Sequence, residues 1–333
     1  VITAHEQGAA HAADGYARAT GRTGVVLVTS GPGATNLVTG IATAYMDSVP
    51  MVAITGNVPT PLIGQDSFQE VYIAGITMPI TKHNFVVDRV EDLADILREA
   101  FRIAQTGRKG PVLVDIPKDM TAAVAEFEPV APVKDGYVTE VDMAAVDKAA
   151  EIINAAQRPA IYYGGGVIAS GAGAELSALM KKACMPGAYT LMAAGAVDSN
   201  DPLNLGMVGM HGCRTSNFAL DNADVMVAVG TRFSDRVALA PDEFGRRAKL
   251  IQIDIDPSEV NKNVGVDVSL VGDVKDIICA LLPKINQSCR DEWLTQIAEW
   301  KQEDYYPEDS DTVLKPHQVI RKVNEIAGDD AIY

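Results

Sequence analysis

The residues with the clearest chemical potential lie near the start of the chain, in the stretch from His5 to Asn36. Its first part, HEQGAAHAADGYARATG, has the alanine- and glycine-rich pattern of a helix, with the carboxylate of Glu6 at the front end. Its second part is an apolar strand, VVLVT, that runs into a Gly-Pro-Gly turn and another helix. A carboxylate near a helix start, facing a turn whose glycines let a ligand approach the backbone, can hold a polar cofactor.

Each half of this stretch also has a simpler interpretation. Two effects on the pKa of Glu6 oppose each other, because a helix dipole and a nearby amide lower it and burial raises it. An exposed glutamate that only stabilises the first helical turn gives the same pattern. The segment SGPGATN, residues 30–36, is not a P-loop, since no Gly-Lys-Ser/Thr follows, and an ordinary turn between a strand and a helix also fits it.

The elements that position these residues alternate between strand and helix up to about residue 121. Alternation of this kind predicts a parallel sheet covered by helices, and ligands bind such sheets at the carboxyl ends of the strands. The apolar runs predict strands at Val25–Thr29, Pro50–Thr55 and Val112–Ile116, and the helical spacing of apolar residues predicts helices at Ala34–Met46 and Glu91–Gln105.

A proline-containing segment without clear periodicity, residues 122–142, predicts a linker to a second α/β unit. In that unit, glycines or acids follow successive predicted strands, a pattern that suits a nucleotide-like ligand but also fits ordinary tight turns. We expect the second domain at 143–285, a connector at 286–312 whose two tryptophans pack on a neighbour, and the opening helix and strand of a third domain at 313–333. The predicted elements are helices at Asp142–Ala156, Gly173–Ala183 and Asp273–Leu282 and strands at Pro159–Tyr163, Gly187–Leu191, Asp224–Val229, Lys249–Ile255 and Val268–Val271.

Composition excludes several classes of function. The 333-residue chain carries a net charge of −16, so we expect neither nucleic acid nor an anionic membrane surface as a partner. The four cysteines have neither metal-site nor disulfide spacing, which favours a reduced, cytoplasmic location. We expect no signal peptide and no membrane span. The chain opens at Val1 in a short β-type run and closes on another, so we expect an internal piece of a longer protein.

Eight motifs, in order along nearly the whole chain, resemble the large catalytic subunit of acetolactate synthase (acetohydroxyacid synthase), a family of thiamine-diphosphate enzymes. One such motif alone is weak, whereas eight in order are specific. They are HEQGAAHAADGYAR (5–18), TSGPGATN (29–36), GQDSFQE (64–70), TKHNF (81–85), GRKGPVLVDIPKD (107–119), GMHG (209–212), GTRFSDR (230–236) and IDIDPSE (253–259).

The resemblance implies a pyrimidine-binding domain at 1–121, truncated at its N-terminus, and a Rossmann-like central domain that carries FAD. It implies an enzyme that decarboxylates pyruvate and condenses the resulting enamine with pyruvate or 2-oxobutyrate, in the biosynthesis of valine, leucine and isoleucine. Glu6 matches the family's catalytic glutamate, which binds the aminopyrimidine of thiamine diphosphate. Pro32, Asn36 and Gln69 match positions that line the same pocket.

Further positions are implied for FAD, whose role in this family is structural, and for the substrate channel. For the channel the matching residues are Phe68, Lys82, Asp235 and Arg236. For FAD they are Ser48, Arg108, Gly164, Gly165, Gly166, Thr190, Leu191, Gly209, Met210, His211, Gly212, Gly230, Thr231, Arg232, Phe233, Ser234, Asp254, Ile255, Asp273 and Val274.

The family's Mg²⁺–diphosphate motif, a Gly-Asp-Gly followed by Asn, belongs to the third domain, and Gly328-Asp329-Asp330 does not match it. We therefore expect this chain to hold half of a cofactor site and to be inactive alone, with the magnesium ligands elsewhere. The resemblance implies a homodimer or homotetramer with a small regulatory subunit. The alternatives are another thiamine-diphosphate enzyme, such as pyruvate oxidase or an FAD-free catabolic acetolactate synthase, and a non-catalytic fragment. A glyoxylate carboligase is disfavoured, because that family lacks the glutamate.

Overall fold

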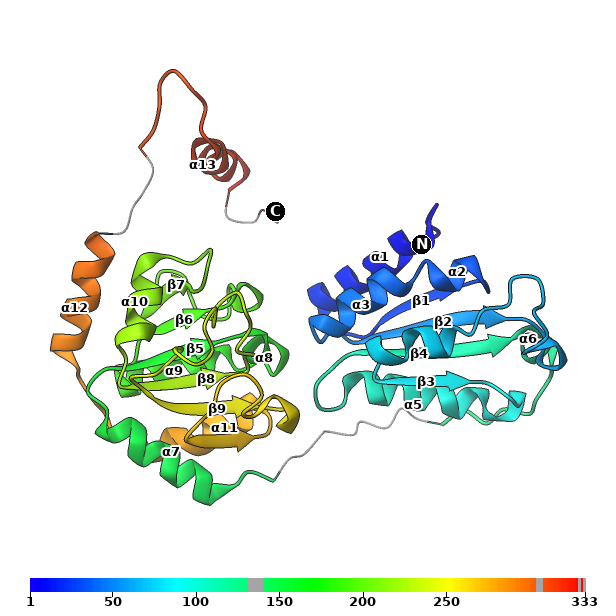
Figure 1. Ribbon diagram of the computed structural model, residues 1–333, viewed down its shortest axis with the longest axis horizontal. Coiled ribbons are helices and arrows are strands. Elements are labelled where there is room, and N and C mark those ends of the chain that lie inside the picture. Colours follow the sequence, from blue (N-terminus) through cyan, green and yellow to red (C-terminus); the bar gives the residue numbers. More distant parts are fainter. Residues whose placement is uncertain (131–139, 304–307, 329–330, 332–333) are drawn as a thin grey trace. The chain divides into compact units, whose positions relative to one another are not determined.

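The computed structural model describes residues 1–130, 140–303, 308–328 and 331 (Figure 1). Backbone contacts divide it into two units. The first comprises Val1–Asp142, Asp254–Val260 and Val271–Ile277, and the second comprises Met143–Ile253, Asn261–Leu270 and Ile278–Tyr333. Parts of the predicted linker (131–139) and of the predicted C-terminal strand (329–330 and 332–333) lie outside the described residues.

The first unit is built on a four-stranded sheet in the order β1-β2-β4-β3. All three pairings are parallel, as the alternation of strands and helices predicts. The two central strands are buried along most of their length, whereas the edge strand β1 exposes alternate residues. The strands are β1 (Gly24–Val28), β2 (Met51–Asn57), β3 (His83–Val86) and β4 (Pro111–Pro117).

Helices cover both faces of this sheet. On one face, α1 (Glu6–Thr20) and α3 (Val38–Met46) bury small residues against the strands. A Cβ on Gly40 of α3 would lie 2.4 Å from the Cβ of Ala10 in α1, so the two helices can pack this closely only because residue 40 is glycine. On the other face, α5 (Leu93–Gln105) buries Ala100 and Ala104 against the sheet.

The predicted helix Ala34–Met46 is wrong as a single element, because the chain forms α2 (Pro32–Thr35) and then α3. A turn at Asn36 and Leu37 separates the two, with the Leu37 amide bound to the Ala34 carbonyl at 3.1 Å. The side chain of Asn36 is hydrogen-bonded to Glu6 instead of lying along a helix. The remaining short helices of this unit are α4 (Ile73–Thr77), α6 (Lys118–Ala122), η1 (Thr60–Leu62), η2 (Met78–Ile80) and η3 (Val90–Asp92).

The second unit holds a six-stranded sheet in the order β10-β9-β8-β5-β6-β7 (Figure 1). Strands β5 and β8 are buried along their whole length, as expected for central strands of a sheet covered on both faces. The two parallel sheets confirm the predicted α/β class. The strands are β5 (Pro159–Tyr163), β6 (Gly187–Tyr189), β7 (Asn204–Met207), β8 (Val225–Val229), β9 (Lys249–Asp254) and β10 (Val268–Val271).

Two helices of the second unit, α10 (Arg214–Asn222) and α12 (Asp291–Gln302), pack on each other through aromatic side chains. Trp293 and Trp300 of α12 stack edge-on at 5.7 Å, and Phe218 of α10 meets Trp300 at the same distance. The connector helix thus packs on a neighbour, as predicted. The helices from residue 143 onward are α7 (Met143–Ala155), α8 (Gly165–Ala169), α9 (Gly173–Ala183), η4 (Leu191–Ala193), α10 (Arg214–Asn222), η5 (Pro257–Glu259), α11 (Val274–Leu281), η6 (Leu282–Lys284), α12 (Asp291–Gln302) and α13 (Pro316–Ala327).

Among the described residues, no helix is both long enough and apolar enough to cross a membrane. The helix α13 falls where we predict the opening helix of a third domain.

Candidate active site

Glu6 is the first residue of α1, so its carboxylate lies at the positive end of that helix. The preceding residue, His5, has an extended backbone with φ −144° and ψ 137° and caps the helix. Its Nδ1 atom accepts a hydrogen bond from the Gln7 amide at 3.1 Å. The position of Glu6 at the helix front, predicted from the HEQG sequence, is therefore confirmed.

The structure brings Asn36 to Glu6 across 30 residues of sequence. The Asn36 Nδ2 atom donates a hydrogen bond to Glu6 Oε2 at 3.0 Å. Gly33 also lies next to this carboxylate, because a Cβ at residue 33 would be 3.6 Å from Glu6 Oε1. A Cβ there would also lie only 2.7 Å from Thr29 Cγ2, so residue 33 must be glycine for the turn to pack here. The turn therefore brings its backbone, without a side chain, next to the carboxylate.

The structure also shows which of the two opposing effects on the pKa of Glu6 is larger. The hydrogen bond from Asn36 is the largest cause that lowers the pKa of Glu6, followed by a backbone hydrogen bond, and together they outweigh the effect of burial. Glu6 is therefore ionised at neutral pH in this structure. An ionised carboxylate can accept a hydrogen bond from a ligand nitrogen and can take up its proton.

Gln69 lies against the same glycine turn. Gly31 has φ 58° and ψ −118°, and a Cβ there would be only 2.7 Å from the Gln69 carbonyl oxygen. Gln69 itself has φ 60°, in the left-handed region. Pro32 opens α2 and is exposed. Three of the predicted pocket residues, Glu6, Asn36 and Gln69, thus gather around the turn at 31–33.

The predicted channel residues have different environments. Phe68, next to Gln69, is 89% exposed. Lys82 instead donates hydrogen bonds to the carbonyls of Ile103 and Thr106, the latter at 2.6 Å, at the C-terminal end of α5. Burial, and next the charge of Arg102, lower the pKa of Lys82 to about 8. Its contact with the end of α5 is a structural role that the sequence reasoning missed.

In the second unit, the glycine turns that follow β5 and β8 touch each other. The Gly166 amide donates to the Gly230 carbonyl at 2.9 Å, and a Cβ on Gly166 would lie 2.6 Å from the Gly230 Cα. A Cβ on Gly164 would lie 2.6 Å from the Thr231 Cβ. Glycine is needed here because the two backbones are in contact, and the predicted flavin residues of these two turns do come together.

The turn that follows β6 contacts the turn that follows β5. The Thr190 amide donates to the Tyr163 carbonyl at 2.9 Å, and a Cβ on Gly165 would be 3.2 Å from the Met192 Cβ, one residue beyond Leu191. Leu191 is 72% exposed, so its apolar side chain is open to solvent at this edge of the sheet.

The turn at 209–212 lies beside the GTRFSDR segment. The Met210 amide donates to the Arg236 carbonyl at 2.9 Å, and a Cβ on Gly209 would lie 2.5 Å from the same oxygen. His211 and Gly212 complete this turn, with the Gly212 amide bound to the Gly209 carbonyl at 2.9 Å. The side chains of Arg236 and Asp235 are largely exposed and 3.8 Å apart.

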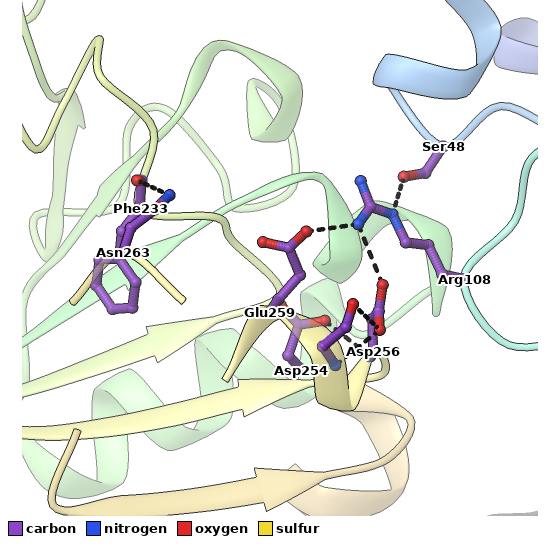
Figure 2. Close-up of polar contacts among 8 residues, drawn as sticks. Ser48, Arg108, Phe233, Asp254, Asp256, Glu259 and Asn263 are labelled. Atoms are coloured by element: carbon purple, nitrogen blue, oxygen red, sulfur yellow. Dashed lines mark hydrogen bonds and ion pairs between the residues drawn. The ribbon is translucent and has the colours of Figure 1, made fainter. Parts of the chain in front are cut away.

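The backbone of the GTRFSDR segment is held by its neighbours. The carbonyl of Arg232 accepts from the Tyr162 hydroxyl at 3.1 Å. The carbonyl of Phe233 accepts from Asn263 Nδ2 at 2.9 Å, as Figure 2 shows. The Ser234 amide donates to the Arg232 carbonyl at 2.9 Å.

Arg108 is the centre of a polar cluster in the first unit (Figure 2). Its Nε donates to Ser48 Oγ at 2.9 Å, so two of the residues implied for FAD are in contact. Its Nη1 binds Glu259 Oε1 at 2.7 Å and Asp256 Oδ2 at 3.2 Å. The sequence reasoning missed these two carboxylates as partners of Arg108, although both belong to the IDIDPSE motif that it singled out.

Asp254 ends β9 and is 8% exposed. Burial is the largest of the effects that raise its pKa, to about 6. Ile255 follows it, half-buried. Asp273 Oδ1 accepts from the Lys275 amide at 2.8 Å and so caps the start of α11, while Val274 is 3% exposed and packs in the core. A structural role therefore accounts for the contacts of these last two residues.

No group of three or more His, Cys, Asp or Glu side chains in the described part of the chain is arranged to hold a metal ion. The donors around Glu6 are one carboxylate and one amide, which suit a hydrogen-bonding ring rather than a cation. The residues at this site therefore fit the aminopyrimidine of the implied cofactor.

Two domain models match this chain. Residues 1–76 match the model described as thiamine pyrophosphate enzyme, N-terminal TPP binding domain. Residues 146–281 match the model described as thiamine pyrophosphate enzyme, central domain. The first match contains the Glu6 site, and the second contains the glycine turns that follow β5, β6 and β8.

Curated relatives resemble the chain along nearly its full length. An acetolactate synthase of Arthrospira platensis is 50% identical over 85% of this chain and 50% of its own length. A probable acetolactate synthase large subunit of Methanocaldococcus jannaschii is 46% identical over 98% of this chain and 57% of its own. An acetolactate synthase of Mycobacterium bovis is 48% identical over 100% of this chain and 56% of its own. The chain thus spans about half the length of the curated relatives it matches.

Proposed function

This chain belongs to the thiamine pyrophosphate enzymes, and from that premise we propose that it is part of an acetolactate synthase large subunit. The whole protein would be a transferase that decarboxylates pyruvate and joins the two-carbon product to pyruvate or 2-oxobutyrate. The products, 2-acetolactate and its homologue, serve branched-chain amino-acid biosynthesis.

The observation that carries this proposal is the geometry of Glu6. Its carboxylate is ionised, is fixed by Asn36 at 3.0 Å and lies beside Gly33, which has no side chain to cover it. Thiamine diphosphate, when bound, supplies the electron sink that decarboxylation of a 2-keto acid needs. Glu6 would bind a ring nitrogen of its pyrimidine and hold a proton there, while Gln69 and Pro32 shape the pocket wall.

The proposal includes FAD as a second, structural cofactor. Its support is the set of glycine turns after β5, β6 and β8, whose backbones meet in close contact at the carboxyl ends of the strands. Arg108 supports it as a group that can bind two oxygens of a pyrophosphate, and Asp254 as an acceptor for ribose hydroxyls. Flavin titration, followed by absorbance, separates this proposal from an FAD-free synthase.

The same proposal assigns the remaining parts of the working enzyme. Mg²⁺ and the diphosphate would be bound outside this chain, so the 333 residues alone would be inactive. The whole protein would be a homodimer or homotetramer with a small regulatory subunit. A cytoplasmic location is part of the proposal, supported by four free cysteines.

The test uses a protein as long as the curated relatives, with this sequence, assayed with pyruvate, thiamine diphosphate, Mg²⁺ and FAD. We expect 2-acetolactate, and a protein that makes none would contradict the proposal. With inorganic phosphate and O₂ also present, acetyl phosphate and hydrogen peroxide as the products would instead identify a pyruvate oxidase.

The substitution Glu6→Gln tests the role of the carboxylate. Glutamine keeps the shape and the hydrogen bond but can no longer take up a proton, so we expect kcat to fall by at least about 100-fold, the scale of lost acid–base help. Unchanged turnover would remove Glu6 from the mechanism.

A further inference from the structure

The loop from Thr60 to Glu70 carries two of the predicted site residues, Phe68 and Gln69, and holds them in an unusual way. Asp66 and Gln69 have φ values of 53° and 60°. Residues other than glycine rarely adopt this left-handed conformation, because it brings the Cβ close to the following carbonyl. Such a conformation persists only where surrounding contacts enforce it.

Gln69 is also where the loop meets the glycine turn. A Cβ on Gly31 would be 2.7 Å from the Gln69 carbonyl oxygen and 2.9 Å from the Gln69 Cβ. The left-handed backbone of Gln69 therefore sets how closely the loop approaches the turn beside Glu6. The neighbouring Phe68 side chain is 89% exposed, so packing of that ring does not hold the loop in place.

The carboxylate of Glu70 closes the loop upon itself. One of its oxygens accepts a hydrogen bond from the Gly64 amide, and the other accepts from the Ser67 amide at 2.9 Å. The Glu70 amide in turn donates to the Ser67 carbonyl at 3.0 Å, and Ser67 Oγ donates to the Leu62 carbonyl at 3.1 Å. These bonds connect the middle of the loop, at Gly64 and Ser67, to the residue that follows Gln69.

A second carboxylate fixes the start of the loop. Asp119 Oδ1, in α6, accepts from the Thr60 amide at 3.0 Å. The backbone hydrogen bonds of Gly64 and Ser67 lower the pKa of Glu70, and that of Thr60 lowers the pKa of Asp119. Both carboxylates are thus ionised at neutral pH, the form in which each oxygen accepts hydrogen bonds.

We propose that Glu70 is a positioning residue, which holds the loop 60–70 so that Gln69 lies against the glycine turn and Phe68 is presented to the second 2-keto acid. The role of Phe68 rests on the proposed function. Glu70 does not itself touch the reacting groups in this proposal, and it acts through the backbone of Gln69.

The first test measures hydrogen exchange in the 333-residue chain by mass spectrometry, on peptides that cover residues 58–72. Glu70→Gln keeps the size but can accept from only one of the two amides, and Glu70→Ala from neither. We expect exchange in this segment to be about tenfold faster in Glu70→Ala, with Glu70→Gln in between, because local opening no longer breaks these bonds. Asp66→Asn is the matched control, since it removes one negative charge from the same loop without touching either amide.

The second test measures steady-state kinetics of Glu70→Gln in the protein as long as its relatives. We expect KM for the 2-keto acid to rise several-fold with a smaller fall in kcat, whereas Asp66→Asn behaves as the parent. Loop exchange that is equal in all four proteins would overturn the positioning role. Faster exchange in a protein that makes no acetolactate would retain the role of Glu70 in the loop and reject the proposed function.

Discussion

At the scale of single residues, the ionised state of Glu6 depends mainly on one neighbour. Asn36 donates the hydrogen bond that lowers the pKa of Glu6 most. We expect Asn36→Ala to raise this pKa toward its ordinary value, measured by ¹³C NMR titration of the glutamate carboxyl carbons. Thr35→Ala is the control, because Thr35 Oγ1 binds the Pro32 carbonyl and not Glu6. Equal Glu6 pKa values in Asn36→Ala and the parent chain would contradict this account.

The sign of the pH effect follows from the same contact. A carboxyl whose pKa is lowered in the folded state stabilises the fold above its unfolded pKa, and this contribution is lost as the pH falls through the folded value. We therefore expect Asn36→Ala to weaken the acid dependence that Glu6 adds to the free energy of unfolding. This effect on stability is small, because Glu6 lies near the protein surface and solvent screens its charge.

The sequence could predict Glu6 at a helix front but not what binds it. The HEQG pattern places a carboxylate in the first turn of a helix by local rules. Asn36 reaches Glu6 only because the chain turns between α2 and α3, and that turn depends on packing between elements. The Gln69 contact has the same origin, because its left-handed backbone is set by the loop that Glu70 closes.

At the scale of elements, α5 is stabilised at its C-terminal end by a lysine from outside the helix. Lys82 donates to the carbonyls of Ile103 and Thr106, which no further helical turn can satisfy. We expect Lys82→Met to lower the free energy of unfolding by about 1 kcal/mol, somewhat less than a fully buried charged hydrogen bond contributes, because the group is only half-buried. Chemical denaturation of the 333-residue chain measures this, with the exposed Lys118→Met as the control.

The pH dependence of this effect has a definite sign. The pKa of Lys82 is lowered to about 8 in the folded chain, whereas an unfolded lysine titrates near 10.4. Between these values the unfolded state binds more protons, so stability rises with pH there. The difference in stability between the parent chain and Lys82→Met should therefore grow from pH 8 to pH 10, and a difference that shrinks would contradict the burial of this ammonium.

Regular, strongly patterned elements were predictable, and irregular ones were not. The amphipathic run at 91–105 becomes α5, with Ala100 and Ala104 buried as the helical period requires. The short strand β3 was missed, because its four residues, HNFV, include two polar ones and only pairing with β4 makes them a strand. The break at Asn36 was missed because apolar residues at helical spacing continue through it.

At the scale of the whole chain, the two cofactor-related domains could be predicted from the order of the motifs. The sequence could not predict that the loop after β9 belongs to the first unit. That assignment involves the contact of Arg108 with Glu259, which are 151 residues apart in the sequence. Contacts over such separations depend on tertiary packing and leave no local pattern in the sequence. The predicted domain limits at 121, 143 and 285 stay predictions.

Each unit has its own buried core, and the two tryptophans provide a probe for one of them. Trp293 and Trp300 both lie in the second unit, whereas Leu113 is fully buried in β4 of the first. We expect Leu113→Ala to destabilise the first unit by about 3 kcal/mol, as for other buried leucines, because it leaves a cavity among closely packed side chains. The circular dichroism transition of the first unit should then move to lower denaturant, while the tryptophan fluorescence transition stays in place.

The matched variant is Leu176→Ala, at a fully buried leucine of α9 in the second unit. It should move the fluorescence transition, because its cavity opens in the unit that holds both tryptophans. A Leu113→Ala chain whose fluorescence and circular dichroism transitions shift together would contradict separate unfolding, and it would mean that the two cores unfold as one cooperative structure.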